Sequence, residues 1–355
     1  MPDRQSKELM SALAIVAPGQ PLREGLDRIL KASMGALIVV GDGPEVLNIS
    51  SGGFLVNAAY SPQRLSELAK TDGAIVLTSD TGYIARANVH LVPNPNVPTE
   101  ETGTRHRTAE RVARSIGVPV ISVSEDMAVV TVYTKSQRYQ LEPIPWILGR
   151  CNQALQTLER YKARLNEEST NLTALEVEDV VTLRDVAAVV QRGEMVHRIA
   201  DEIETMIVEL GVDARLLRLQ LDELYVEIDD EIDLVIGDYL PNGHTVAEAH
   251  QAMAELDSDD VLDLRKTSLA LVPANGADDL DQSMAPKGLR LLARVPRLNT
   301  DTAVAITNFF GELTKLQRAT VADLLVVPGV STTQAQAIKD TLARVVEATI
   351  MDQYT

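Results

Sequence analysis

Residues 68–77 have the sequence LAKTDGAIVL, in which an amphipathic segment passes through an Asp-Gly turn into four apolar residues. A similar apolar run, ALIVV at residues 36–40, ends at the turn residues GDG. Short apolar runs bounded by turn residues are typical of strands that are buried inside a sheet. The two runs therefore predict buried strands at 36–40 and 74–77.

The rest of the first 150 residues alternates between helical and strand-like patterns. Amphipathic periodicity predicts helices at 9–17, 22–32 and 64–70, the last of them after the start signal Ser61-Pro62. Further strands are predicted at 83–88, 118–123 and 129–133. This alternation indicates an α/β (α+β) domain built on a mixed sheet.

The charge of the chain is unevenly distributed. Residues 1–150 hold 15 basic and 15 acidic side chains, 151–285 hold 10 and 30, and 286–355 hold 8 and 6. The strand signals fade from residue 147, and helical periodicity is plainest at 177–210. We therefore predict a first domain at 1–146, an all-α spacer at 147–285 whose stretch 273–286 is a linker, and an all-α domain at 286–355.

Composition excludes several classes of protein. The one cysteine, Cys151, rules out an intramolecular disulfide framework and a cysteine-rich zinc site. No apolar run approaches the roughly 18 residues that a bilayer crossing needs, so we expect no membrane association and a cytoplasmic protein. Strong acidity of the middle segment disfavours nucleic acid there, whereas the tail could still contact DNA.

Two short segments carry candidate chemistry in the first domain. Asp72-Gly73-Ala74 lies where a helix ends and a buried strand begins, so a carboxylate there could face a cleft; an ordinary turn is the alternative. The segment 103–111 begins with Gly103, supplies two hydroxyls and, at 105–107, three basic side chains, and continues as a helix. Helix N-terminal amides with Arg105 and Arg107 could cradle a triphosphate; a solvated basic helix is the alternative.

These two segments, together with Gly52-Gly53-Phe54 and the run PTEETGTRHRT at 98–108, resemble the signature of the diadenylate cyclase domain family. The resemblance implies that two ATP molecules are condensed into cyclic di-AMP with release of two pyrophosphates. It implies Mg²⁺ (or Mn²⁺) as cofactor, held by Asp72, which also engages the ribose 3′-hydroxyl. The catalytic residues would be Asp72, Arg105, His106 and Arg107. The ATP-binding residues would be Asp72, Gly73, Ala74, Leu91, Gly103, Thr104, Arg105, His106, Arg107, Thr108 and Ser124, with Gly73 and Leu91 beside the adenine.

The chemistry explains why such residues are suited to the reaction. Nucleotidyl transfer needs positioning and charge stabilisation more than covalent help from the protein. His106 could act as an acid or base, or it could simply contact phosphate. Because the product is two-fold symmetric and each domain would hold one ATP, two domains must face each other.

The chain departs from the family pattern after the predicted strand at 118–123. Relatives commonly carry serine followed by basic residues, whereas this chain has Ser124-Glu125-Asp126-Met127. Ser124 can keep its contact with phosphate. The lost positive charge implies a weaker triphosphate site or more reliance on the metal. Thr71, where many relatives have methionine, is a milder change.

The segment 287–346 resembles a tandem helix-hairpin-helix module. Its clearer copy spans 321–338 around a Pro-Gly-Val-Ser turn, and the other, around 295–299, has no glycine in its turn. Such hairpins aim backbone amides at DNA phosphates without reading bases. The expected DNA-binding residues are Pro328, Gly329, Val330, Ser331, Thr332 and Arg297. A helical packing module that binds no DNA is the alternative.

The order of cyclase domain, helical spacer and hairpin tail resembles the DNA integrity scanning (DisA) family over essentially the whole chain. That resemblance implies a homo-octamer through facing cyclase domains, and cyclase output lowered by sequence-independent binding of branched DNA. A second hypothesis is a DNA-binding scaffold or repair factor whose first domain senses nucleotide without cyclising it. A third hypothesis is another ATP-using transferase or a nuclease. The sequence has neither a phosphate loop of the Gly-x-x-x-x-Gly-Lys type nor the carboxylate cluster of a two-metal nuclease.

Overall fold

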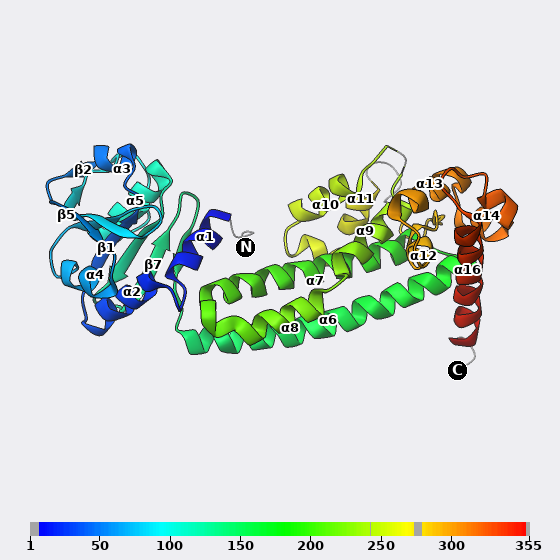
Figure 1. Cartoon of the computed structure of the whole chain (residues 1–355), viewed down its shortest axis with the longest axis horizontal. Coiled ribbons are helices and arrows are strands. Elements are labelled where there is room, and N and C mark those ends of the chain that lie inside the picture. The colour runs from blue at the N-terminus through cyan, green and yellow to red at the C-terminus, as the bar shows by residue number, and fades with distance from the viewer. Residues whose placement is uncertain (1–6, 242, 273–278, 353–355) are drawn as a thin grey trace. The chain divides into compact units, whose positions relative to one another are not determined.

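The computed structural model describes residues 7–241, 243–272 and 279–352 (Figure 1). The chain divides into two compact units, each described below by itself. The first unit comprises residues 2–155 and 201–221, and the second comprises 156–200 and 222–355. None of the helices in the described residues combines the length and the apolar character that a membrane span requires.

The first unit is built on a mixed sheet, as predicted. Its strands lie in the order β2-β5-β4-β1-β6-β7-β8, with β3 paired to β5, and β1 and β4 run parallel to each other while the other pairs are antiparallel. The bounds are β1 Ala36–Val40, β2 Ser50–Ser51, β3 Phe54–Ala59, β4 Ala74–Leu77, β5 Tyr83–Leu91, β6 Val120–Ser124, β7 Val129–Tyr133 and β8 Arg138–Gln140. The two apolar runs are the adjacent parallel strands β1 and β4, all of whose residues are buried.

Both faces of this sheet are covered by helices, because alternate side chains of each strand point to opposite faces. Ile38 and Val40 pack in a cluster with α1 (Lys7–Val16), α2 (Pro21–Lys31) and α4 (Pro62–Leu68). Leu37 and Val39 pack in a second cluster with α3 (Pro44–Asn48) and α5 (Thr104–Ile116). The alternating side chains of β1 therefore contribute to the apolar core on both faces of the sheet.

Apart from an isolated β-bridge between Thr182 and Ser283, the regular secondary structure in the rest of the described chain is helical. The first of its helices are α6 Ile144–Glu178, α7 Leu183–Leu210, α8 Arg215–Tyr225, α9 Ile228–Tyr239, α10 Val246–Glu255 and α11 Leu264–Leu271, with short 3₁₀ turns at Gly211–Ala214 and Asp260–Leu262. The continuous helical pattern predicted for 177–210 is wrong at its start. The chain breaks between α6 and α7, where the Asp185 carboxylate accepts hydrogen bonds from the backbone amide (2.8 Å) and hydroxyl (2.6 Å) of Thr182. This cap starts α7 as a new helix.

The C-terminal part of the second unit is also helical. It contains α12 Leu289–Ala293, α13 Thr300–Phe310, α14 Leu313–Arg318, α15 Val321–Leu324 and α16 Thr332–Asp352, which share one apolar core. Of the predicted linker 273–286, residues 273–278 lie outside the described residues. The remainder lies beside the start of α7, where Arg184 and Leu183 donate backbone hydrogen bonds to Leu280 and Gln282.

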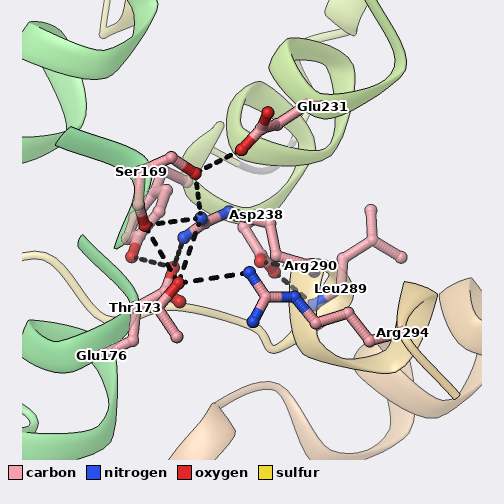
Figure 2. A network of polar contacts seen from close by, with 9 residues as sticks. Ser169, Thr173, Glu176, Glu231, Asp238, Leu289, Arg290 and Arg294 are labelled. Carbon is pink, nitrogen blue, oxygen red and sulfur yellow. Dashed lines mark hydrogen bonds and ion pairs between the residues drawn. The ribbon is translucent and has the colours of Figure 1, made fainter. Parts of the chain in front are cut away.

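A buried polar network joins α12 to α6 and α9 (Figure 2). The Arg290 guanidinium forms an ion pair with Glu176 at 2.8 Å and donates to the Ser169 hydroxyl at 2.8 Å; the side chains of Arg290 and Glu176 are 3% and 1% exposed. Asp238 accepts the backbone amides of Leu289 (2.5 Å) and Arg290 (2.9 Å), and so caps α12. Burial raises the pKa of Asp238 to about 6. The network fixes the first helix of the tail to the spacer.

Candidate functional site

The predicted site residues converge at one edge of the sheet. Leu37 lies opposite Ala74 in the register of β1 with β4, so Gly35 and Asp72 come two residues earlier on neighbouring strands. Ala36 lies opposite Val123 in the register of β1 with β6, so Gly35 also neighbours Ser124. Asp72 and Ser124 are thus brought to the same edge although 52 positions separate them.

Glycines let the loop that carries Asp72 approach the backbone of β5. Gly73 has a φ of +94°, and a Cβ there would lie 2.9 Å from the carbonyl oxygen of Val89. The carbonyl of Asp72 accepts a hydrogen bond from the side-chain amide of Asn88 at 2.5 Å. The pairing of β4 with β5 is irregular at this point, which is typical of strands that re-aim a side chain at a site.

The Asp72 side chain is exposed and makes no hydrogen bond or ion pair with any other described residue. Residues within the described ranges form no cluster of three or more His, Cys, Asp or Glu that could hold a metal. A single free carboxylate does fit Mg²⁺, because this ion is commonly bound through one or two carboxylates, with water and substrate phosphates as its other ligands. The protein thus offers one hard oxygen ligand at the edge.

The first turn of α5 contributes Arg105 to the same edge. Its guanidinium lies over Gly35, where any Cβ would be 2.1 Å from Nη1, and Nη1 donates to the carbonyl of Val123 at a long 3.4 Å. No side chain caps this helix, whose N-cap is Gly103. Arg105 and the free amides of the first turn therefore offer donors for anionic oxygens next to Ser124.

His106 belongs to a chain of polar contacts that sequence reasoning missed. Its Nδ1 lies 2.8 Å from the Tyr133 hydroxyl, which donates to Glu101 at 2.8 Å, and Glu101 pairs with Arg138 at 2.8 Å. Because Tyr133 donates to the carboxylate, its oxygen accepts from His106, whose buried Nε2 has no partner among the described residues. Burial is the main cause of the lowered pKa of His106. These contacts fix a neutral imidazole in one orientation.

Arg107 points toward the preceding loop. It donates to the carbonyls of Glu101 (3.3 Å) and Thr102 (3.0 Å). Arg111 and Arg114 continue this face of α5 and donate at 3.0 Å to the carbonyls of Val97 and Pro98. The spacing of these three arginines on one helical face is the signal that could have identified them as anchors of the loop at 97–102.

The remaining predicted ATP contacts have mixed surroundings. Thr104 is exposed, and Thr108 donates its hydroxyl to the Thr104 carbonyl at 2.8 Å. Ala74 and Leu91 are buried in the core between the sheet and α5. The Ser124 hydroxyl accepts the amide of Met127 at 3.4 Å, across the turn that carries the exposed Glu125 and Asp126.

Each predicted hairpin copy of the tail is a turn between two helices. Arg297 adopts a φ of +64° in the first turn, at the place where Gly329 adopts +90° in the second. Asn299 caps α13 through Thr302 at 2.8 Å, and Ser331 accepts the Gln334 amide at 3.3 Å at the start of α16. The Gln334 side-chain amide lies 3.5 Å from the Arg297 carbonyl, so the two turns lie together. The absence of glycine has therefore not prevented the first turn from forming.

Comparison with known proteins gives two family matches. Residues 23–138 match the family described as "DisA bacterial checkpoint controller nucleotide-binding", and residues 141–277 match "DisA bacterial checkpoint controller linker region". The site described above lies within the first of these matches.

Curated relatives match along nearly the whole chain. The DNA integrity scanning protein DisA of Parafrankia sp. is 51% identical, with 97% of each chain covered. The protein of the same name from Kineococcus radiotolerans is 50% identical over 100% of both chains, and that from Streptomyces coelicolor is 46% identical over 98% of this chain and 94% of its own. This chain therefore belongs to the DisA family of DNA integrity scanning proteins.

Proposed function

We propose that this chain is a diadenylate cyclase that converts two ATP molecules into cyclic di-AMP and two pyrophosphates. We base this on the sheet edge at which Asp72, Arg105 and Ser124 converge. The Asp72 carboxylate has no partner there among the described residues. In the reaction a 3′-hydroxyl bonds to the α-phosphorus of a second ATP while the α,β-anhydride breaks. In a second transfer the two nucleotides exchange these roles, which closes the ring and releases the second pyrophosphate.

The residues divide the work between binding and positioning. Asp72 orients the 3′-hydroxyl and would hold Mg²⁺ or Mn²⁺, which when bound neutralises charge on the α-phosphate. Arg105, Thr104 and the first-turn amides of α5 hold the triphosphate. His106, fixed through Tyr133, and Arg107, fixed to Thr102, position the first turn and its loop.

Two such domains must face each other for ring closure, and we propose that they do so within a homo-octamer. Large apolar side chains are exposed beside the site: Phe54 and Leu55, which follow Gly53, are 67% and 73% exposed. Exposed apolar groups of this size are typical of interaction surfaces. We expect Leu55→Glu to give chains that bind ATP but do not cyclise it, with the assembly measured by light scattering.

We propose that the two tail hairpins are helix-hairpin-helix elements that bind branched DNA without reading sequence. The backbone amides at the start of α16 and the turn residues Pro328, Gly329, Val330, Ser331 and Thr332 would contact phosphates. Arg297 adds a cation beside them, since its turn lies against Gln334 of the second hairpin. Binding should weaken steeply with salt.

Product identification tests the proposed reaction. Purified protein is incubated with ATP and Mg²⁺, Mn²⁺ or a chelator, and nucleotides are identified by chromatography with mass detection. Cyclic di-AMP formed only with metal supports the proposal. Bound but unchanged ATP with both metals would favour the scaffold hypothesis, with Glu125 and Asp126 beside Ser124 as the physical cause.

A further inference from the structure

A cavity of about 580 Å³ lies in the second unit between α6, the turn after α12, and α16. Its polar lining includes Thr173 from α6, Arg294 from the turn, and Thr341 and Arg344 from α16. None of the described residues that line it is acidic. The volume falls within the range of roughly 300–1,000 Å³ that small-molecule sites occupy.

The two arginines of the cavity have no carboxylate partner among the described residues. Arg294 makes one hydrogen bond there, from Nη2 to the Thr173 hydroxyl at a long 3.5 Å. Arg344 donates to the Asp340 carbonyl at 3.3 Å and the Thr341 hydroxyl at 3.2 Å, both within its own helix. Most of their guanidinium donors are therefore available to a ligand.

The carboxylates of the buried network make other contacts, although Oε2 of Glu176 has no hydrogen-bond partner among the described residues. Glu176 pairs with Arg290, Asp238 caps α12, and Glu231 contacts the Ser169 hydroxyl (Figure 2). The pKa of Arg294 is lowered, first by burial and then by the charge of Arg290, while the charges of Glu176 and Glu231 act in the opposite direction. Its guanidinium still stays charged at neutral pH, because arginine loses its proton only far above neutral pH.

We propose that this cavity binds a small phosphate-bearing ligand of nucleotide size. Arg294 and Arg344 would hold the phosphate, and threonine hydroxyls would donate to it. Ala174, Val345 and Ala348 offer an apolar wall for an attached ring. A cavity with arginines beside apolar walls fits a ring joined to phosphate better than a single phosphate of a DNA backbone. The site is separate from the sheet edge of the first unit.

Equilibrium dialysis of ADP against the full chain tests the site. We expect Arg294→Gln combined with Arg344→Gln to weaken one ADP-binding site at least about tenfold for each arginine, since hydrogen bonds to charged groups are the stronger ones. Ala348→Trp, which fills the cavity and leaves both charges, should cause the same loss. Thermal unfolding of each variant reports whether it folds.

Arg160→Gln is the matched control. Arg160 lies on α6 outside the cavity and, like Arg344, donates to the carbonyl four residues earlier and the threonine hydroxyl three residues earlier, both at 3.3 Å. The Arg160→Gln chain should bind ADP as the unsubstituted chain does. Unchanged ADP binding in both cavity variants would overturn the proposal. So would unchanged ADP binding with weakened binding of a DNA duplex, which would assign the arginines to the DNA surface.

Discussion

The sheet edge of the first unit and the buried network of the second both gather charged side chains, but they satisfy them differently. At the edge, Asp72 is exposed and has no partner among the described residues. In the network, Asp238 is 1% exposed and accepts two backbone amides. A carboxylate that the protein leaves free is available to a ligand, whereas one that caps a helix maintains the fold. The contrast separates a site suited to binding a ligand from a buried network that stabilises the fold.

Breaking the buried network should have the largest effect on stability. Arg290→Met leaves the Glu176 carboxylate buried without its ion pair, and such changes cost about 3–5 kcal/mol of unfolding free energy. Arg184→Met is the control: its pair with Asp281 is 51% and 74% exposed, so about 1 kcal/mol or less is expected. Chemical denaturation followed by circular dichroism compares the two. Equal losses would show that the buried network is not special.

A methyl group at the edge should have the next largest effect. Gly73→Ala places Cβ 2.9 Å from the Val89 carbonyl oxygen at a φ of +94°, which we expect to cost about 1–3 kcal/mol and most of the cyclase rate. Gly43→Ala is the control, since its φ is −63° and nothing lies within 4 Å of the added Cβ. Initial rates and thermal unfolding of both variants test the difference. A fully active Gly73→Ala chain would place the active geometry elsewhere.

The contribution of the buried network to stability should also depend on pH. The folded chain holds a proton on Asp238 up to a pKa of about 6, above the ordinary value of 3.8, so folding favours the protonated form. The contribution of this group to unfolding free energy should rise as pH falls through 6, by at most about 1.4 kcal/mol per pH unit. Asp238→Asn should flatten that slope in denaturation series between pH 7 and 5. An unchanged slope would contradict it.

The smallest effect is expected in the first tail turn. Arg297→Gly removes a side chain from a φ of +64° and should stabilise the chain by up to about 1 kcal/mol. If Arg297 contacts phosphate, the same change weakens DNA binding. It also lowers the slope of the logarithm of the binding constant against the logarithm of salt concentration by about 1. Thermal unfolding and fluorescence anisotropy with a branched duplex measure the two effects. Weaker stability would contradict the strain, and unchanged DNA binding would contradict the contact.

How much could be predicted from the sequence depends on how local each feature is. The strands 36–40 and 74–77 were found because five or four successive apolar residues are a local pattern. Strand β3, which pairs with β5, was missed because most of its residues are exposed and form no buried apolar run. The break at Thr182 was missed although Thr182 and Asp185 are a capping signal three residues apart.

The site shows the same limit. Asp72 and Arg105 were predicted from short motifs, whereas the chain from His106 through Tyr133 to Glu101 joins residues 27 and 32 positions apart. The ion pair of Glu176 with Arg290 spans 114 positions. Contacts over such separations depend on packing, which no pattern in a single sequence specifies.

The role of Asp72 in the cyclase reaction is tested by comparing the rates of cyclic di-AMP formation by Asp72→Asn and Asp42→Asn. Both residues precede glycine, but Asp42 follows β1 at the opposite end of the parallel pair. We expect Asp72→Asn to lose at least about 100-fold in rate, as for groups that stabilise a transition state, with unchanged thermal unfolding. We expect Asp42→Asn to keep its rate. If Asp72→Asn cyclised ATP as fast as Asp42→Asn, Asp72 would not be a catalytic residue.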